Sequence, residues 1–350
     1  MKSESTLSRR SPRILIVRLS AIGDVIQQMP VACALREHLP EAFLAWAVEA
    51  RAATLLRGHR ALDELIELPR GWLKSPRTVW RLRRQLRAME FDVVLEAQGL
   101  TKSALLGRLS GAKRRIGYDK PRGRELSRWL NTQLLEATAE HVVDANLELL
   151  RPLGIERPAV RFDVPELPAD RASAEEMIRQ AGLDGGFALI NPGAGWPSKI
   201  WPAERHAAVA RYLGQRRGLP SMVLWAGEEE RTLAERIVSQ SDRHAQTAPA
   251  TSLAEVAALS RRCRLFIGSD TGPLHLAAAV AAPCVGLYGP WPARKHGPYG
   301  PQHVVLQKMY IEGSTKQRRN ASPKYMEAIT VEMVTQACET ILGRSDREAA

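Results

Sequence analysis

The segment at residues 268–283, GSDTGPLHLAAAVAAP, places small and polar residues between an apolar run and an alanine-rich stretch. The pattern predicts a buried strand that turns directly into a helix. Such a turn could be only a connection, capped by Asp270 or Thr271. Alternatively, Gly272 lets a ligand approach the backbone, the helix N-terminus attracts an anion, and His275 adds a hydrogen bond or a charge. On these residues alone, both interpretations stay open.

Three other expected strand-to-helix turns carry polar side chains. The stretch RLSAIGDVIQQMP places Ser20 and Asp24 after the first apolar run, where Asp24 is either a helix cap or a carboxylate available for acid–base chemistry. The stretch NPGAGWPSKIWP combines glycines with Lys199, which suits a phosphate group or a simple connecting loop. The stretch WAGEEER places Glu228 where it could bind ribose hydroxyls or complement a helix dipole. Taken together, the strand ends of the second half predict a nucleotide site.

The elements that must position these residues alternate along the chain. The apolar runs RILIVRL, FLAWAVE, LIELP and FDVVLEA are separated by stretches with helical spacing, which predicts a parallel sheet covered by helices. The proline-rich segment at residues 154–170 breaks this alternation and is the predicted linker. The runs FALIN, MVLWAG, RLFIG and CVGLYG then restart it. Two doubly wound α/β domains are therefore expected, with ligands at the carboxyl ends of the strands.

The expected division of the chain follows from these patterns. Residues 1–12 are polar and basic and predict a flexible extension, with the pattern of neither a signal peptide nor a membrane anchor. One domain is expected over residues 13–165 and a second over residues 175–323. A last helix, over residues 324–345, is expected to pack across the interface between the two domains.

Composition limits the class of protein. A chain of 350 residues exceeds the usual size of one core, and a net charge of +12 favours anionic partners without choosing among nucleic acids, nucleotides and lipid phosphates. The cysteines are scattered without a CxxC pair, which argues against a zinc site or a disulfide framework and favours a cytosolic setting. The stretch RTVWRLRRQLR predicts an amphipathic helix, either a solvated surface or a contact with an anionic membrane or acceptor.

Four motifs resemble, in their order and spacing, the bacterial lipopolysaccharide heptosyltransferases of glycosyltransferase family 9. They are ILIVRLSAIGDVIQQMP, DVVLEAQGLTKSALLGRLSG, NPGAGWPSKIWP and GSDTGPLHLAAAVAAPCVGLYGP, and the AQGLTKSA segment is most similar to the heptosyltransferase I branch. The resemblance implies an inverting glycosyltransferase of the GT-B architecture, with two Rossmann-like doubly wound domains facing a cleft. The N-terminal domain would bind the acceptor and the C-terminal domain the ADP-sugar donor.

The resemblance also implies substrates and residue roles. The donor would be ADP-L-glycero-D-manno-heptose, used without a cofactor or a metal ion. The acceptor would be a Kdo-bearing lipid A core at the cytoplasmic face of the inner membrane. Asp24 would be the catalytic base, Lys199 a diphosphate contact, and Glu228, or a neighbour within residues 228–230, the ribose contact. The remaining donor residues would be Asp270, Thr271, Gly272 and His275, and the acceptor residues Ser20, Lys102, Arg122 and Arg124.

The sequence departs from the family pattern in two places. Trp291, in YGPWPARKHGPYG, stands where many relatives have a Thr-Asp-Pro segment, and QKMYIEGSTKQRRNASPKYM matches no pattern of the family. The resemblance therefore predicts the reaction class more directly than the sugar or the acceptor. Two alternatives are a GT-B transferase that uses another nucleotide sugar and a non-catalytic basic protein that binds nucleic acid. The latter leaves the ordered strand-end motifs unexplained, so no nucleic-acid partner is expected. The sequence predicts no oligomeric state.

Overall fold

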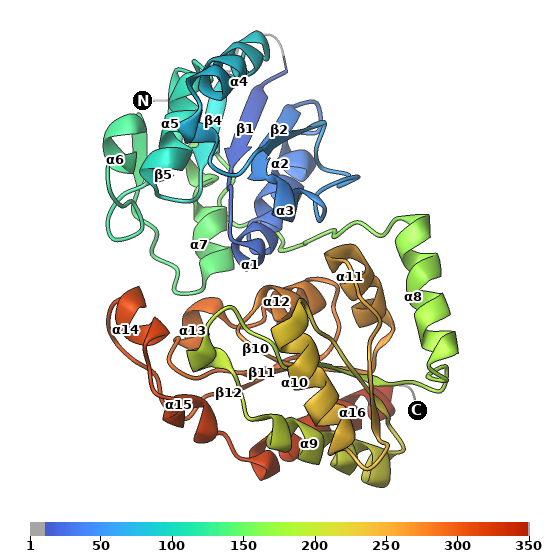
Figure 1. Ribbon diagram of the computed structural model, residues 1–350. Coiled ribbons are helices and arrows are strands. Elements are labelled where there is room, and N and C mark those ends of the chain that lie inside the picture. The colour runs from blue at the N-terminus through green and yellow to red at the C-terminus, as the bar shows by residue number, and fades with distance from the viewer. Residues whose placement is uncertain (1–10, 349–350) are drawn as a thin grey trace. The chain divides into compact units, whose positions relative to one another are not determined.

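The computed structural model describes residues 11–348 and divides the chain after Pro165 into two compact units. This division falls within the proline-rich segment. Each unit contains a six-stranded parallel sheet with helices on its faces, which confirms the predicted α/β class (Figure 1). Residues 1–10 of the predicted extension lie outside the described residues. The second unit begins before residue 175, because a helix at residues 168–180 belongs to it.

The sheet of the first unit has the strand order β3-β2-β1-β4-β5-β6. Its central strands are continuous apolar runs because helices cover both of their faces. The sequence analysis did not predict the two strands at the far edge, β5 and β6. The strands are β1 (Arg13–Val17), β2 (Phe43–Glu49), β3 (Glu64–Leu68), β4 (Val93–Glu96), β5 (Arg114–Tyr118) and β6 (Gln133–Leu135).

The helices of the first unit form two layers. On one face α2 packs against α7, and on the other α5 packs against both α4 and α6. Five elements begin or follow this first face: α1 (Ile22–Ile26), α2 (Met29–His38), α3 (Ala50–Ala53), α7 (Val142–Glu148) and the 3-10 helix η2 (Arg151–Leu153), which follows α7. The other elements are the 3-10 helix η1 (Trp72–Lys74), α4 (Pro76–Ala88), α5 (Thr101–Leu109) and α6 (Ser127–Leu130).

The sheet of the second unit has the order β12-β11-β10-β7-β8-β9. The four inner strands follow the predicted apolar runs, whereas the edge strands β9 and β12 have three residues each and were not predicted. The strands are β7 (Ala188–Asn191), β8 (Ser221–Val223), β9 (Ala245–Thr247), β10 (Leu265–Ser269), β11 (Cys284–Leu287) and β12 (Val304–Leu306).

The helices of the second unit also form two layers, with α8, α11 and α12 packed in series on one side and α10, α9 and α16 on the other. The longer helices are α8 (Pro168–Gln180), α9 (Ala203–Arg217), α10 (Glu228–Ser239), α11 (Leu253–Arg262), α12 (Gly272–Ala279) and α16 (Val331–Glu348). The short elements are the 3-10 helix η3 (Pro197–Lys199), α13 (Ala293–His296), α14 (Thr315–Arg319) and α15 (Lys324–Glu327). No helix within residues 11–348 has both the length and the apolar character needed to cross a membrane.

The C-terminal helix differs from the prediction of one helix over residues 324–345. Thr330 interrupts the expected helix, because its hydroxyl oxygen accepts a hydrogen bond from the Met333 backbone at 3.3 Å and begins α16 as a separate helix. Val334, Cys338 and other apolar residues of α16 belong to the core of the second unit. The helix therefore completes that core, and its expected packing across the interface between the domains stays a prediction.

Candidate active site

Residues predicted from separate motifs meet at the carboxyl edge of the second sheet. Strands β10, β7 and β8 are neighbours and all parallel, so the loops that follow them lie at the same edge. Asn191 ends β7 and is followed by the loop that carries Lys199, while α12 begins directly after β10. The fold thus brings the Lys199 loop to the turn that opens α12.

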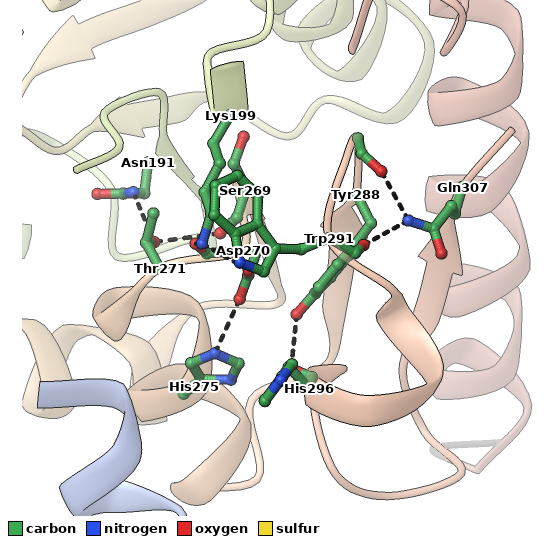
Figure 2. Close-up of polar contacts among 11 residues, drawn as sticks. Asn191, Lys199, Ser269, Asp270, Thr271, His275, Tyr288, Trp291, His296 and Gln307 are labelled. Atoms are coloured by element: carbon green, nitrogen blue, oxygen red, sulfur yellow. Dashed lines mark hydrogen bonds and ion pairs between the residues drawn. The ribbon is translucent and has the colours of Figure 1, made fainter. Parts of the chain in front are cut away.

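A chain of three side chains connects this loop to α12 (Figure 2). Lys199 Nζ lies 2.6 Å from Oδ2 of Asp270 and also donates a hydrogen bond to the Asp270 carbonyl oxygen, 3.0 Å away. His275 Nε2 lies 3.2 Å from Oδ1 of Asp270. An ionised carboxylate can only accept a hydrogen bond, so the Nε2 atom of His275 is the donor and carries a proton. Burial raises the pKa of Asp270, but the His275 hydrogen bond and the Lys199 charge outweigh burial and hold the pKa well below its usual range. Asp270 is therefore ionised and positions both neighbours.

The start of α12 has no capping side chain in the described part of the chain. Thr271 occupies the N-cap position, but its side chain makes no capping hydrogen bond. The Thr271 hydroxyl instead donates to the Ser269 carbonyl oxygen at 3.1 Å and accepts a hydrogen bond from Asn191 Nδ2 at 3.4 Å. Thr271 is therefore the N-cap by position, as the connecting-turn interpretation expects, but its side chain does not cap the helix. Backbone N–H groups from Gly272 onward, together with Lys199, form an environment suited to a diphosphate.

Glu228 and Glu230, both at the start of α10, have different surroundings. The Glu228 side chain is 84% exposed, and Arg231, its ion-pair partner, lies 3.8 Å away. Glu230 accepts a hydrogen bond from the Ala226 backbone at 2.9 Å. Its carboxyl group fills the space that a Cβ atom on Gly193 would occupy. Because Gly193 belongs to the loop after β7, Glu230 is the glutamate that the fold brings to the Lys199 loop.

Trp291, which departs from the family pattern, contacts the predicted site directly. Lys199 Nζ lies 4.3 Å from the centroid of the Trp291 ring, in a cation–π contact. Gln307 Nε2 holds the loop after β11 by donating hydrogen bonds to the carbonyl oxygens of Gly289 and Trp291, at 2.8 and 2.5 Å. The sequence analysis assigned neither Trp291 nor Gln307 to the site. The unusual GPWP sequence was the available signal for Trp291.

A second contact that the sequence did not predict involves the segment at residues 307–326. Helix α14, from this segment, packs against η3, which carries Lys199. The Arg319 guanidinium carbon lies 4.0 Å from the centroid of the Trp196 ring, and Trp196 directly precedes η3. The segment that matches no family pattern therefore lies beside the Lys199 loop and supports it.

In the first unit, Asp24 lies in the first turn of α1 and not at its N-cap, which is Ala21. The Ala21 backbone donates a hydrogen bond to Asp24 Oδ2 at 3.2 Å, and Arg18 Nη2 lies 2.8 Å from the same oxygen. Arg18 is buried and donates to the Ala97 carbonyl oxygen, whereas the Asp24 side chain is 36% exposed and Ser20 is half-buried. A buried arginine thus positions a carboxylate that is accessible to solvent.

Glu96 organises the AQGLTKSA turn, and the sequence analysis did not identify it. This buried carboxylate accepts hydrogen bonds on Oε1 from the Gln98 backbone at 3.0 Å, the Gly99 backbone at 2.8 Å and the Ser103 hydroxyl at 2.7 Å. Burial raises the pKa of Glu96 even though each of these hydrogen bonds lowers it. Gly99 has φ = +68°, and a Cβ atom there would collide with the Arg122 carbonyl oxygen. The turn is therefore pressed against the segment that carries Arg122.

The predicted acceptor residues lie near this turn. Lys102 lies in the first turn of α5, and its Nζ lies 2.9 Å from Oε1 of Glu49 at the end of β2. The Arg124 backbone donates to the Gly99 carbonyl oxygen at 3.0 Å, and the Arg124 side chain is exposed. Arg122 Nη2 donates to a backbone carbonyl oxygen at 3.4 Å. The structure thus brings Lys102, Arg122 and Arg124 to one turn and pairs Lys102 with an acid that the sequence did not indicate.

Among residues 11–348, no three His, Cys, Asp or Glu side chains gather where they could hold a metal ion. The four cysteines are buried free thiols. The expectation that the reaction uses neither a metal ion nor a cofactor stays a prediction.

Two Rossmann-like units, each with polar residues at the carboxyl edge of its sheet, are typical of the GT-B class of glycosyltransferases, whose solved structures this chain resembles. The sequence profile of glycosyltransferase family 9 (heptosyltransferase) matches residues 79–326. The chain therefore belongs to this family, as the motifs predict.

Individual relatives agree with this assignment. The chain is 29% identical over 306 residues to lipopolysaccharide heptosyltransferase 1 of Pseudomonas aeruginosa, covering 84% of this chain and 83% of the relative. The crystal structure of a family 9 glycosyltransferase from Veillonella parvula is similar with a TM-score of 0.84 and 25% identity, over 97% of this chain and 99% of that chain. E. coli heptosyltransferase WaaC with ADP-2-deoxy-2-fluoro heptose is similar with a TM-score of 0.74 and 26% identity, over 94% and 99%.

Proposed function

We propose that the protein transfers L-glycero-D-manno-heptose from ADP-heptose to a Kdo-lipid A acceptor of the lipopolysaccharide inner core, with inversion. The observation that carries the donor half of this proposal is the Lys199–Asp270–His275 chain at the uncapped start of α12. It combines a cation, an ordered histidine and backbone donors, which suits the diphosphate of a nucleotide sugar. The WaaC structure, with its fluorinated ADP-heptose, supports heptose as the sugar.

The proposed reaction assigns a task to each group. Asp24 accepts the proton of the attacking acceptor hydroxyl as the oxygen bonds to the anomeric carbon of the heptose. The bond between that carbon and the diphosphate oxygen breaks, and its electron pair leaves with ADP. Lys199 and the N–H groups of α12 stabilise the negative charge that develops on the diphosphate. The acidic side chain beside Gly193, Glu230, accepts hydrogen bonds from the ribose hydroxyls.

The proposed acceptor is anionic, and the first unit offers positive charge for it. Lys102, Arg122 and Arg124 meet at the turn that Glu96 organises, and Ser20 lies in the Asp24 turn. These residues are proposed to bind phosphate or carboxylate groups of the acceptor core. Such an acceptor is anchored in a bilayer, so the proposed location is peripheral, at the cytoplasmic face of the inner membrane.

A donor screen tests the proposed function. The full-length protein is incubated with Kdo-lipid A and, in separate reactions, ADP-heptose, other ADP-sugars and UDP-sugars, and the products are weighed by mass spectrometry. We expect a mass increase of one heptose with ADP-heptose alone. Transfer of a hexose from another nucleotide sugar, with none from ADP-heptose, would replace the donor but keep the reaction class. Tight oligonucleotide binding without any turnover would support the nucleic-acid alternative.

Two variants at neighbouring positions test the ribose contact. Glu230→Gln is expected to weaken ADP binding by about tenfold to a hundredfold, because hydrogen bonds to a charged group contribute about 1.5–3 kcal/mol. Glu228→Gln is the matched control, since it removes the same charge from the same helical turn at an exposed position. Isothermal titration calorimetry with ADP measures both. A loss of affinity in the Glu228 variant alone would restore the original assignment.

A further inference from the structure

Helix α4 presents an unusual outer surface. Residues 76–88 contain five arginines and no acidic residue. All five arginines are exposed, and none forms an ion pair with an acidic side chain within residues 11–348. The α4 surface, as we define it, consists of Arg77, Trp80, Arg81, Arg83, Arg84 and Arg87.

A tryptophan lies at the centre of this basic surface. Leu82 and Leu86 bury the inner side of α4 against the core of the first unit. Trp80 lies on the opposite side of the helix, with Arg77 and Arg84 one turn away in each direction. Its side chain is 61% exposed, and the Arg84 guanidinium carbon lies 4.9 Å from its ring centroid. The large aromatic ring of Trp80 is therefore exposed to solvent and lies on the side of α4 that faces away from the core.

The same layer of the first unit exposes more apolar and basic groups. Leu73, in η1 just before α4, is 40% exposed. Helix α5 packs against both α4 and α6, and in and beside α6 the side chains of Trp129 and Leu126 are 81% and 58% exposed. Desolvation lowers the pKa of Arg115, and the nearby positive charge of Arg108, at the end of α5, lowers it further. Exposed tryptophan and leucine side chains therefore recur across the layer, near basic residues.

We propose that the α4 surface binds the anionic surface of a phospholipid bilayer, with Trp80 inserted at the level of the lipid headgroups. The arginines are attracted electrostatically to the negatively charged lipid headgroups. A tryptophan ring is suited to the membrane–water interface because one edge of the ring is apolar and the other is polar. The exposed leucines favour a bilayer over a nucleic acid, because acyl chains accept aliphatic side chains whereas bases stack on aromatic rings. The proposal rests on the proposed function in one respect, that the acceptor lies in a bilayer.

Vesicle flotation with the full-length protein tests the proposal. We expect the protein to float with vesicles of phosphatidylcholine and phosphatidylglycerol and not with phosphatidylcholine alone. Arg77→Gln combined with Arg84→Gln should weaken binding by about thirtyfold, since each basic residue near an anionic bilayer contributes about fivefold. Arg216→Gln combined with Arg243→Gln removes two exposed arginines of the second unit and should change binding little.

Trp80→Ala separates insertion from charge attraction. The wild-type protein should keep part of its vesicle binding at high salt, and Trp80→Ala should lose that part. Equal effects of the two double-arginine variants, or no flotation of the wild type, would overturn the proposal. Binding to an oligonucleotide but not to vesicles would assign the α4 surface to nucleic acid instead.

Turnover on a deacylated, water-soluble acceptor keeps this test distinct from that of the proposed function. All α4 variants should keep the wild-type rate on that acceptor, because α4 carries none of the proposed reaction groups. If the wild-type protein shows no turnover on the soluble acceptor, the proposed function is contradicted, regardless of the result of vesicle flotation.

Discussion

Replacement of Asp24 by asparagine is expected to lower kcat by about 10²- to 10⁴-fold while ADP affinity stays unchanged. This is the usual contribution of a general base, and the amide cannot accept the proton of the acceptor hydroxyl. Asparagine can still accept the hydrogen bond from the Ala21 backbone, so the first turn of α1 should persist. Steady-state kinetics at saturating donor and acceptor, with calorimetry for ADP, measure the effect.

The ion pair with Arg18 requires a control, because Asp24→Asn also removes the partner of a buried guanidinium. Arg18→Gln breaks the same pair from the other side and keeps the carboxylate. If Asp24 is the base, Arg18→Gln should lower the melting temperature but keep much more of kcat than Asp24→Asn. Equal losses of kcat in the two variants would mean that the ion pair affects catalysis only by stabilising the fold of the turn. A normal kcat in Asp24→Asn would show that Asp24 is not the catalytic base.

Replacement of Lys199 by alanine is expected to weaken ADP binding by about 1.5–3 kcal/mol, the range for a hydrogen bond to a charged group. The melting temperature of the ligand-free protein should also fall, because buried Asp270 would keep His275 but lose its lysine partner. Isothermal titration calorimetry and thermal denaturation measure the two effects separately.

Lys295→Ala is the matched control for Lys199, since it removes one exposed lysine from the same unit. Its ADP affinity should stay close to that of the wild type. An equal loss in both variants would show that Lys199 acts only through the overall charge of the unit. An unchanged ADP affinity in a folded Lys199→Ala protein would remove Lys199 from the donor site.

Local pattern was sufficient to predict the two parallel sheets. The apolar runs that form β1, β2, β4, β7 and β10 are buried on both faces. Each run is therefore continuously apolar and predicts a strand, even without knowledge of the adjacent strands. The three-residue edge strands β6, β9 and β12 exist because an adjacent strand offers its backbone hydrogen bonds. Their own residues carry too little pattern to predict them.

The position of polar residues at the ends of parallel strands could be predicted from the sequence, because these residues come directly after each apolar run. Which of these side chains contact one another depends on how the strands and helices pack together. Successive helical residues point about 100° apart, so the packing of α10 selects Glu230 over Glu228 for contact with the Lys199 loop. Lys199 and Asp270 are 71 residues apart, and Lys102 and Glu49 are 53 apart. No local spacing encodes such pairs, because they arise when separate strands align at one edge of a sheet.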